Sequence, residues 1–362
     1  MPGGPLSGVR VLELAGLGPA PFGCMVLSDL GADVLRVGRP DGVSGRQAFD
    51  TLNRGRRNIV IDLKSEDGLA SVRRLGAAAD VMVEGFRPGV AERLGVGPNP
   101  MCAANPRLVY ARMTGWGQDG PLAQRAGHDI NYASIAGVIG AIGEPGRKPV
   151  PPLNLVADFG GGGMFLVAGV LAALIERNSS GLGQVVDVAM VDGTAMLMAM
   201  ALGFTSVGLQ TPKRGTNLLD GGAPFYDCYE CSDGGWISVG ALEPQFFAEF
   251  VRVLGIAEHV PPQNDRNTWP QMRDMFAAVI KSRPRSHWTE VFDGVDACVT
   301  PVLAVDEVVR NPHIAERGTV QEVNGVLQPA AAPRFSRTPA DSPTTPRDQH
   351  LSTGEALSAW DC

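Results

Sequence analysis

The chain has 362 residues, of which 44% are hydrophobic and 19% charged, and its formal net charge is −7. This length and composition predict a soluble globular protein of about two domains with a large core. The negative charge argues against general nucleic-acid binding, because neutralising phosphates requires a basic face. The N-terminus lacks a signal-peptide profile, and no uninterrupted apolar run reaches about 18 residues, so a cytoplasmic protein without membrane association is expected.

Short runs rich in valine, isoleucine and leucine predict strands in the first third of the chain. They cover residues 9–14, 33–37, 58–63, 80–84 and 108–113, and helical patterns at 21–30 and 66–77 separate several of them. Strands that alternate with helices indicate an α/β fold with a parallel sheet. Ligands of such sheets bind at the carboxyl ends of the strands, so the residues that follow each strand are candidate binding residues.

The first predicted strand leads into Gly16-Leu-Gly-Pro-Ala-Pro21, which partly resembles a dinucleotide-binding fingerprint. Proline stands at position 21, where the third glycine of that fingerprint belongs, and no acidic residue follows the next strand to bind a ribose. The stretch is therefore interpreted as a tight turn from strand to helix, and a nicotinamide cofactor is not expected.

Arginine is concentrated between residues 33 and 57, where six arginines stand against three acidic residues. The arginines are Arg36, Arg39, Arg46, Arg54, Arg56 and Arg57. A basic pocket in an acidic protein suggests a small polyanionic ligand, and a solvated surface is the alternative explanation.

His128 and Asp158 each stand at the start of an apolar segment with helical spacing, and residues 164–175 after Asp158 predict a buried helix. The partial positive charge of a helix N-terminus is expected to keep His128 neutral and to favour the carboxylate form of Asp158. A histidine and an aspartate from two helices can flank one substrate carbon as an acid/base pair. A helix cap at Asp158 and a core hydrogen bond at His128 are the ordinary alternatives.

Later segments add weaker signals. The methionines at 196, 198 and 200 suggest either an adaptable apolar binding surface or ordinary core. A hairpin is predicted at 225–231 and 236–239, followed by a helix at Pro244 that Glu243 would cap, unless Glu243 orients a histidine. Cys228 and Cys231 have metal-like spacing but lack a second pair, so no zinc site is expected. The cysteines are expected to be reduced.

Several motifs resemble the family III CoA-transferase superfamily over nearly the whole chain. These motifs are Leu6-Ser-Gly-Val-Arg-Val-Leu-Glu-Leu14, Leu30-Gly-Ala-Asp-Val34, Asp62-Leu-Lys-Ser65, Glu84-Gly-Phe-Arg-Pro-Gly89, Thr114-Gly-Trp-Gly-Gln-Asp-Gly-Pro121, Gly183-Gln-Val-Val-Asp187 and Ala332-Pro-Arg-Phe-Ser-Arg337. Within this superfamily, the segment 126–132 with Asp158 and Glu243 resembles the bacterial alpha-methylacyl-CoA racemases.

The resemblance implies a Rossmann-like large domain with a parallel sheet, formed by residues 1–200 and completed by 328–362. It also implies a small α/β domain at 221–320, with linkers at 201–220 and 321–330. Two chains would interlock as a homodimer, with each active site between the large domain of one chain and the small domain of the other.

The same resemblance implies an isomerase of fatty acid and lipid metabolism that interconverts (2R)- and (2S)-2-methylacyl-CoA by proton transfer through an enolate. His128 would deprotonate the S epimer and Asp158 the R epimer, with Glu243 nearby and the Asp129 backbone N–H at the enolate oxygen. The implied CoA-binding residues are Arg39, Ile61, Asp62, Leu63, Lys64, Gly85, Phe86, Arg87, Arg93, Gly127, Asp129, Ile130, Asn131 and Tyr132. No metal or cofactor is expected, since coenzyme A is part of the substrate.

Two other functions remain open at this point. In a CoA transferase of the same superfamily, Asp158 would be a nucleophile that forms a mixed anhydride with the acyl group. An acyl-CoA-binding protein without catalysis belongs to a different class, and the presence of both His128 and Asp158 disfavours it. The acyl chain itself is left undetermined: branched fatty acyl, sterol side-chain and 2-arylpropionyl thioesters all fit.

Overall fold

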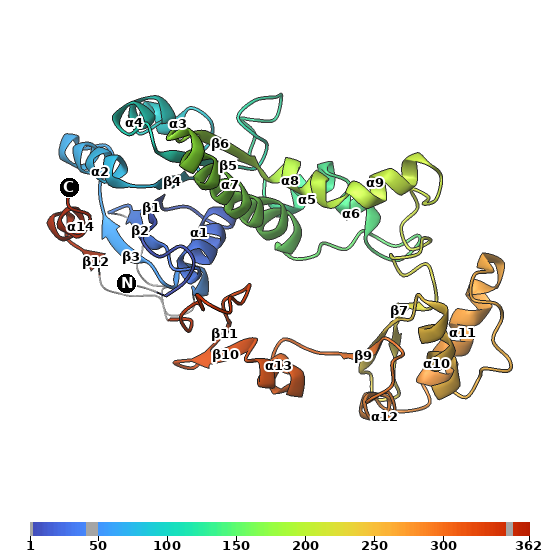
Figure 1. Ribbon diagram of the computed structural model, residues 1–362. Coiled ribbons are helices and arrows are strands. Elements are labelled where there is room, and N and C mark those ends of the chain that lie inside the picture. Colours follow the sequence, from blue (N-terminus) through green and yellow to red (C-terminus); the bar gives the residue numbers. More distant parts are fainter. Residues whose placement is uncertain (1–2, 41–49, 345–349) are drawn as a thin grey trace. The chain divides into compact units, whose positions relative to one another are not determined.

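The computed structural model describes residues 3–40, 50–344 and 350–362 (Figure 1). The chain forms two compact units. The large unit contains Met1–Gly137, Pro152–Met198 and Pro312–Cys362, and the small unit contains Val138–Pro151 and Ala199–Asn311. This division differs from the expected domain limits, because residues 138–151 and 199–220 cluster with the small unit and residues 312–330 with the large one.

A seven-stranded parallel sheet forms the centre of the large unit, with the strand order β12-β3-β2-β1-β4-β5-β6. The strands are β1 (Arg10–Leu14), β2 (Asp33–Gly38), β3 (Arg57–Val60), β4 (Val81–Glu84), β5 (Val109–Thr114), β6 (Val185–Ala189) and β12 (His350–Leu351). The predicted α/β class and parallel sheet are confirmed. β3 ends earlier than predicted, because the Asp62 carboxylate accepts the N–H of Lys64 at 2.9 Å and turns the chain.

Helices cover both faces of this sheet (Figure 1). On one face, α2 (Glu66–Ala78), α4 (Pro98–Ala104) and α14 (Thr353–Ala359) enclose a core that includes Leu12, Leu35 and Trp360. On the other face, α1 (Pro19–Asp29) and α7 (Phe165–Ser180) pack against each other and against the strands. The remaining elements of the large unit are η2 (Thr51–Asn53), α3 (Val90–Arg93), α5 (Asp129–Ile135), η3 (Leu155–Met164), α8 (Met190–Leu197), α13 (Pro312–Arg317), β10 (Val320–Val323) and β11 (Val326–Pro329).

The buried helix predicted at 164–175 begins earlier than expected, as the π-helix η3, and continues as α7. Together they span 26 residues and contain an 18-residue window with a mean hydropathy of 1.8, long and apolar enough to cross a membrane; 44% of this window is buried within the structure. In the large unit α7 packs against β5, β6 and α1.

Glycines allow η3 to approach its neighbours closely. A Cβ atom on Gly161 would lie 2.4 Å from Thr194 Oγ1 of α8, and one on Gly163 would lie 2.5 Å from Phe22 Cδ1 of α1. Any side chain at these positions would force the helices apart. The glycines therefore let η3 pack closely against α1 and α8.

The small unit contains an antiparallel sheet of β7 (Tyr226–Glu230), β8 (Trp236–Gly240) and β9 (Val299–Val302). The predicted hairpin is confirmed as β7 and β8. Its helices are α6 (Val138–Ala141), α9 (Ala199–Ser206), α10 (Pro244–Val253), η4 (Arg266–Thr268), α11 (Trp269–Ile280), α12 (Arg285–Val291) and η5 (Val308–Arg310). Phe225, Phe250 and Phe276 lie at the centre of an aromatic core between sheet and helices.

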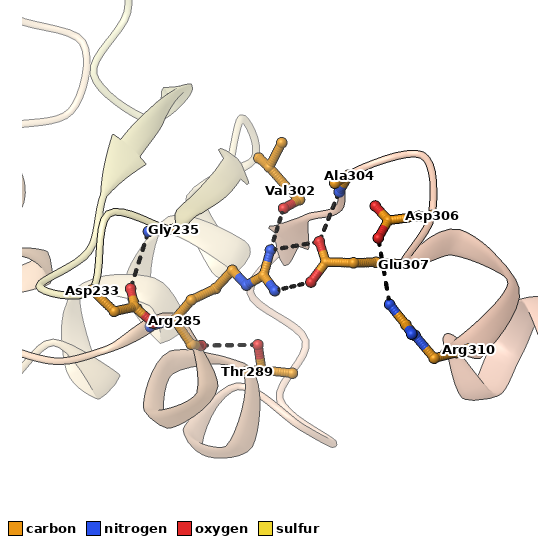
Figure 2. Close-up of polar contacts among 9 residues, drawn as sticks. All are labelled: Asp233, Gly235, Arg285, Thr289, Val302, Ala304, Asp306, Glu307 and Arg310. Atoms are coloured by element: carbon orange, nitrogen blue, oxygen red, sulfur yellow. Dashed lines mark hydrogen bonds and ion pairs between the residues drawn. The ribbon is translucent and has the colours of Figure 1, made fainter.

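A polar cluster joins α12 to the segment that follows β9 (Figure 2). The Arg285 guanidinium donates to both carboxylate oxygens of Glu307 and, at 2.8 Å, to the carbonyl of Val302. Glu307 in turn accepts the N–H of Ala304 at 2.7 Å. Figure 2 also shows Asp233 holding the turn at Gly235. The cluster fixes the chain at the end of the small unit.

The Glu307→Gln variant is expected to reveal this cluster through a pH-dependent stability difference. The hydrogen bond from Arg285 lowers the pKa of Glu307 from 4.5 to about 2. Because the folded-state pKa is depressed, the stabilisation is fully present above pH 4.5 and is lost as the pH falls towards 2. Urea unfolding of both proteins at several pH values should show a difference that shrinks steadily under acid conditions. A difference that does not change with pH would contradict this assignment.

Candidate active site

A cavity of ≈ 380 Å³ lies in the large unit at the carboxyl ends of β1, β4 and β5. The predicted site residues Gly85, Phe86, Arg87, Gly127, His128, Tyr132 and Asp158 line it. It therefore lies at the sheet edge where the sequence placed the candidate binding residues. His128 and Asp158, which come from two different helices, therefore line the same cavity.

His128 is the N-cap residue of α5 and has an extended backbone. Its N–H donates to Asn131 Oδ1 at 3.0 Å, and its carbonyl accepts the N–H groups of Asn131 and Tyr132. The backbone around the histidine is thus held by the first turn of the helix, while the imidazole lines the cavity. Asn131, predicted to bind CoA, acts here as the partner of His128.

Asp158 lies within η3 and is packed against the strand-to-helix turn at Gly18. A Cβ atom on Gly18 would lie 3.1 Å from Asp158 Oδ2, and Gly18 has a φ of 68°. Burial raises the pKa of Asp158, and the charge of Asp129 raises it further, while Asn154 and His128 lower it. The helix-start argument predicted that the carboxylate form is favoured, but burial outweighs the local helix field and shifts the pKa of Asp158 upward, opposite to that prediction.

The side chain of Asp129 fixes the backbone that carries Asp158. Asp129 is 6% exposed, and its Oδ2 accepts the N–H groups of Ala157 and Asp158, both at 2.8 Å. This contact links α5 to η3 and holds the two candidate bases in one unit. The carboxylate of Asp129 is thus turned towards η3, and Asp129, predicted to contact CoA, is not among the residues that line the cavity.

We expect Asp129→Ala to reduce the free energy of unfolding by about 2–3 kcal/mol, because two inward N–H groups lose their charged acceptor. Asp129→Asn keeps an acceptor oxygen at the same place and should lose less. Urea unfolding of the two variants provides the comparison. Equal stability of Asp129→Ala and the wild type would show that the contact is replaced by water.

The ring of Tyr132 packs tightly between Gly115, Gly127 and Trp116, and Tyr132 lines the cavity. A Cβ atom on Gly115 would lie 2.1 Å from its ring and one on Gly127 would lie 2.8 Å from it, so neither glycine can be enlarged without moving the ring. Trp116 meets the ring edge-on at 4.7 Å between centroids. Burial raises the pKa of the Tyr132 hydroxyl, which keeps it a hydrogen-bond donor.

Several lining residues were not among the predicted site residues, namely Leu17, Gly18, Trp116, Arg125 and Met190. A signal for three of them was present in the sequence. Leu17 and Gly18 belong to the glycine turn after β1, and Trp116 follows β5, so both segments stand at carboxyl ends of strands. Met190 starts α8, and nothing in its local sequence marks it.

A second cavity of ≈ 400 Å³ in the large unit is lined by five further residues that were predicted to contact CoA. Arg39, Ile61, Asp62, Leu63 and Lys64 line it together with Phe86. Because Phe86 lines both cavities, the segment from Gly85 to Arg87 lies between them. Arg93 is on α3, and Ile130 is 45% exposed on α5; neither lines the two cavities.

The early arginines divide into two groups. Arg54, Arg56 and Arg57 form ion pairs with Asp29, Glu13 and Asp33 respectively, and the first two arginines are fully buried. These three were counted towards a polyanion site, but internal carboxylates already neutralise them. Arg36 is half-buried on β2 and lines neither cavity, Arg39 remains at a cavity, and Arg46 lies outside the described residues.

Glu243 is in the small unit, at the N-cap position of α10 before Pro244, as predicted. Its side chain makes no capping hydrogen bond within the described part of the chain, so the expected capping role is wrong. The charge of Glu243 contributes, after burial and Asp296, to the raised pKa of Cys298. The glutamate therefore lies close to that thiol of the same unit.

Comparison with known proteins identifies the family to which the chain belongs. The model of CoA-transferase family III matches residues 6–350. The chain is 47% identical to alpha-methylacyl-CoA racemase of Mus musculus over 95% of its own length and 89% of the relative's, and 45% identical to that of Homo sapiens over 96% and 90%. A solved structure of a CAIB/BAIF family protein from Brucella suis superposes with a TM-score of 0.83 at 28% identity and covers 99% of each chain. A match over this much of the sequence and the fold shows that the chain belongs to CoA-transferase family III.

Proposed function

We propose that this protein is an isomerase that interconverts the (2R) and (2S) epimers of 2-methylacyl-CoA thioesters. The observation that carries the proposal is the cavity that is lined by both His128, at the start of α5, and Asp158, in η3. Relatives that are 45–47% identical over almost the whole chain carry the name alpha-methylacyl-CoA racemase.

Inversion at C2 requires one group to remove a proton and a second group to return one to the opposite face of the planar enolate. For the S epimer, neutral His128 takes the proton and protonated Asp158 supplies the other. For the R epimer the roles are reversed. The raised pKa of Asp158 supports this scheme, because a neutral carboxylic acid must persist long enough to act as a donor.

Negative charge develops on the thioester oxygen as the proton leaves. The backbone N–H of Asp129, at the start of α5, is the donor that we assign to this oxygen. Loss of one such donor typically raises the barrier by about 2.7–4 kcal/mol. The proton transfers themselves require no metal or redox cofactor.

The second cavity is proposed as the site of the CoA nucleotide. Arg39 and Lys64 line it and supply positive charge, which suits the diphosphate and the 3′-phosphate of CoA. Phe86 lines this cavity and the one that contains His128. The pantetheine arm would pass along the segment from Gly85 to Arg87 to reach the two bases.

A CoA transferase that uses Asp158 as its nucleophile is the second candidate. Nucleophilic attack requires the ionised carboxylate, whereas burial raises the pKa of Asp158 and so opposes its ionisation. The imidazole of His128 in the same cavity is an acid/base group for which the transferase scheme has no use. Both observations favour the racemase.

The two candidates are separated by incubating one epimer of a 2-methylacyl-CoA in D2O without any acceptor acid. The racemase should incorporate deuterium at C2 and produce the other epimer. A second incubation with an added carboxylic acid tests for transfer of CoA. If CoA moves to the added acid and C2 acquires no deuterium, the assignment is wrong.

We also propose that two chains assemble as an interlocked homodimer, with Glu243 of one chain next to His128 of the other. The support is a run of exposed apolar side chains along residues 196–209. Met196, Leu197, Met200, Leu202, Phe204, Val207 and Leu209 are 39–69% exposed. Light scattering at decreasing protein concentration should give the mass of a dimer, and a monomer at micromolar concentration would contradict the assembly.

A further inference from the structure

Glu84 is a buried carboxylate at the boundary between the sheet and the two cavities. It is the last residue of β4, it is 0% exposed, and the segment from Gly85 to Arg87 follows it directly. Gly85 and Arg87 line the cavity that contains His128, and Phe86 lines both cavities. The conformation of these three residues therefore decides the shape of both binding spaces.

Both oxygens of Glu84 are engaged. Oε2 accepts the N–H of Phe86 at 2.7 Å, which closes a tight turn immediately after the strand. Oε1 accepts Nε–H of Arg112 at 2.9 Å, from the residue directly opposite on β5. One buried carboxylate thus fixes the backbone of the segment to the neighbouring strand.

Arg112 extends the contact to α3. Its Nη2 atom lies 2.9 Å from Glu92 Oε1, and Arg112 is only 8% exposed. Glu92 precedes Arg93, which the family resemblance implies is a CoA contact. The three charged residues Glu84, Arg112 and Glu92 therefore connect the segment from Gly85 to Arg87 with α3.

The opposite end of the same strand provides a comparison. Asp80, just before β4, pairs with Arg177 at 2.9 Å and accepts the N–H of Arg10. Like Glu84, it is a carboxylate that accepts an arginine side chain and a backbone N–H. Asp80 and Arg177 line neither cavity. Glu84 differs from Asp80 because its backbone partner, the N–H of Phe86, belongs to a residue that lines both cavities.

We propose that Glu84, through Arg112, is a positioning residue for CoA binding, holding the backbone of Phe86 and Arg87 and the end of α3 in the geometry that receives the CoA moiety. The inference rests on the proposed function only in taking CoA as the ligand. A segment held in its binding conformation before the ligand arrives avoids the cost of ordering it on binding. Glu84 touches no reacting atom in this scheme.

Glu84→Gln removes one of the two acceptor oxygens and places an amide NH2 group against either Phe86 N–H or Arg112. Both are donors, so one contact must break and the segment is released. We expect Kd for CoA to rise about 10–30-fold, as loss of one charge-assisted contact implies. The rate at saturating substrate should stay within about 3-fold, because His128 and Asp158 are held by other contacts.

Calorimetric titration with CoA alone measures Kd without any reaction at an acyl group. It uses the full chain and the variants Glu84→Gln, Glu84→Asp and Asp80→Asn. Glu84→Asp keeps the buried charge but is one methylene too short to reach both partners, so it should fold and also bind CoA weakly. Asp80→Asn breaks a comparable ion pair and should lower thermal stability while leaving Kd unchanged.

The outcomes are distinct. If Glu84→Asp, or a folded Glu84→Gln, binds CoA as tightly as the wild type, the positioning role is refuted. The role is refuted as well if Asp80→Asn weakens CoA binding to the same extent, because general destabilisation would then explain the effect. If the wild type binds CoA but exchanges no deuterium at C2, the proposed racemase activity fails while the positioning role is still decided by the Kd values.

Discussion

Asp158→Asn is expected to lower the rate of epimer interconversion by about 10²–10⁴-fold, the range for loss of a general acid or base. The amide has nearly the shape of the carboxyl group and can keep the packing against Gly18 and the contact with Asn154. It cannot accept or return the C2 proton. The (2R) epimer should therefore no longer exchange its C2 proton with solvent.

The fold should not suffer from this substitution. Burial raises the pKa of Asp158, which means that the site disfavours a charge and tolerates a neutral group. Thermal unfolding of Asp158→Asn should match or exceed the wild type at neutral pH. Chiral analysis of the product measures the rate, and wild-type interconversion by this variant would remove Asp158 from the mechanism.

His128→Ala is expected to produce a more specific defect, because it removes only one of the two bases. The (2S) epimer should lose exchange at C2, since no base faces its proton. The (2R) epimer should still be deprotonated by Asp158 and reprotonated from the same face. Deuterium should therefore enter the (2R) epimer with retention of configuration, while interconversion falls by about 10²–10⁴-fold.

Proton NMR in D2O with each pure epimer measures this exchange. His259→Ala is a matched control, since His259 is exposed in the small unit and lines neither cavity. It should behave as the wild type with both epimers. Equal loss of exchange from both epimers in His128→Ala would mean that His128 has a structural role, or that one base serves both faces.

The parallel sheet of the large unit could be predicted from the sequence because its strands coincide with short valine-rich runs. β1, β2, β4 and β5 begin and end within one residue of the predicted limits. The π-helical start of η3 has no such signal. Gly161 and Gly163 of η3 pack closely against α8 and α1, which are distant in sequence.

The two candidate bases were found because each is an ionisable residue beside an apolar helical segment. The upward shift of the Asp158 pKa could not be predicted from the sequence, since burial and the nearby charge of Asp129 act through contacts distant in sequence. The arginine excess overstated the free positive charge for the same reason: nothing local indicates that Arg56 is buried against Glu13. Local patterns locate charged residues, whereas tertiary contacts decide what those charges do.

His128 and Asp158 are proposed to face the same substrate carbon from two sides, a geometry that a crystal structure with a bound 2-methylacyl-CoA would reveal. The proposal predicts an imidazole nitrogen and a carboxyl oxygen each about 3 Å from C2, on opposite faces of the thioester plane. A complex in which both groups lie on one face, or in which either is too distant for proton transfer, would contradict it.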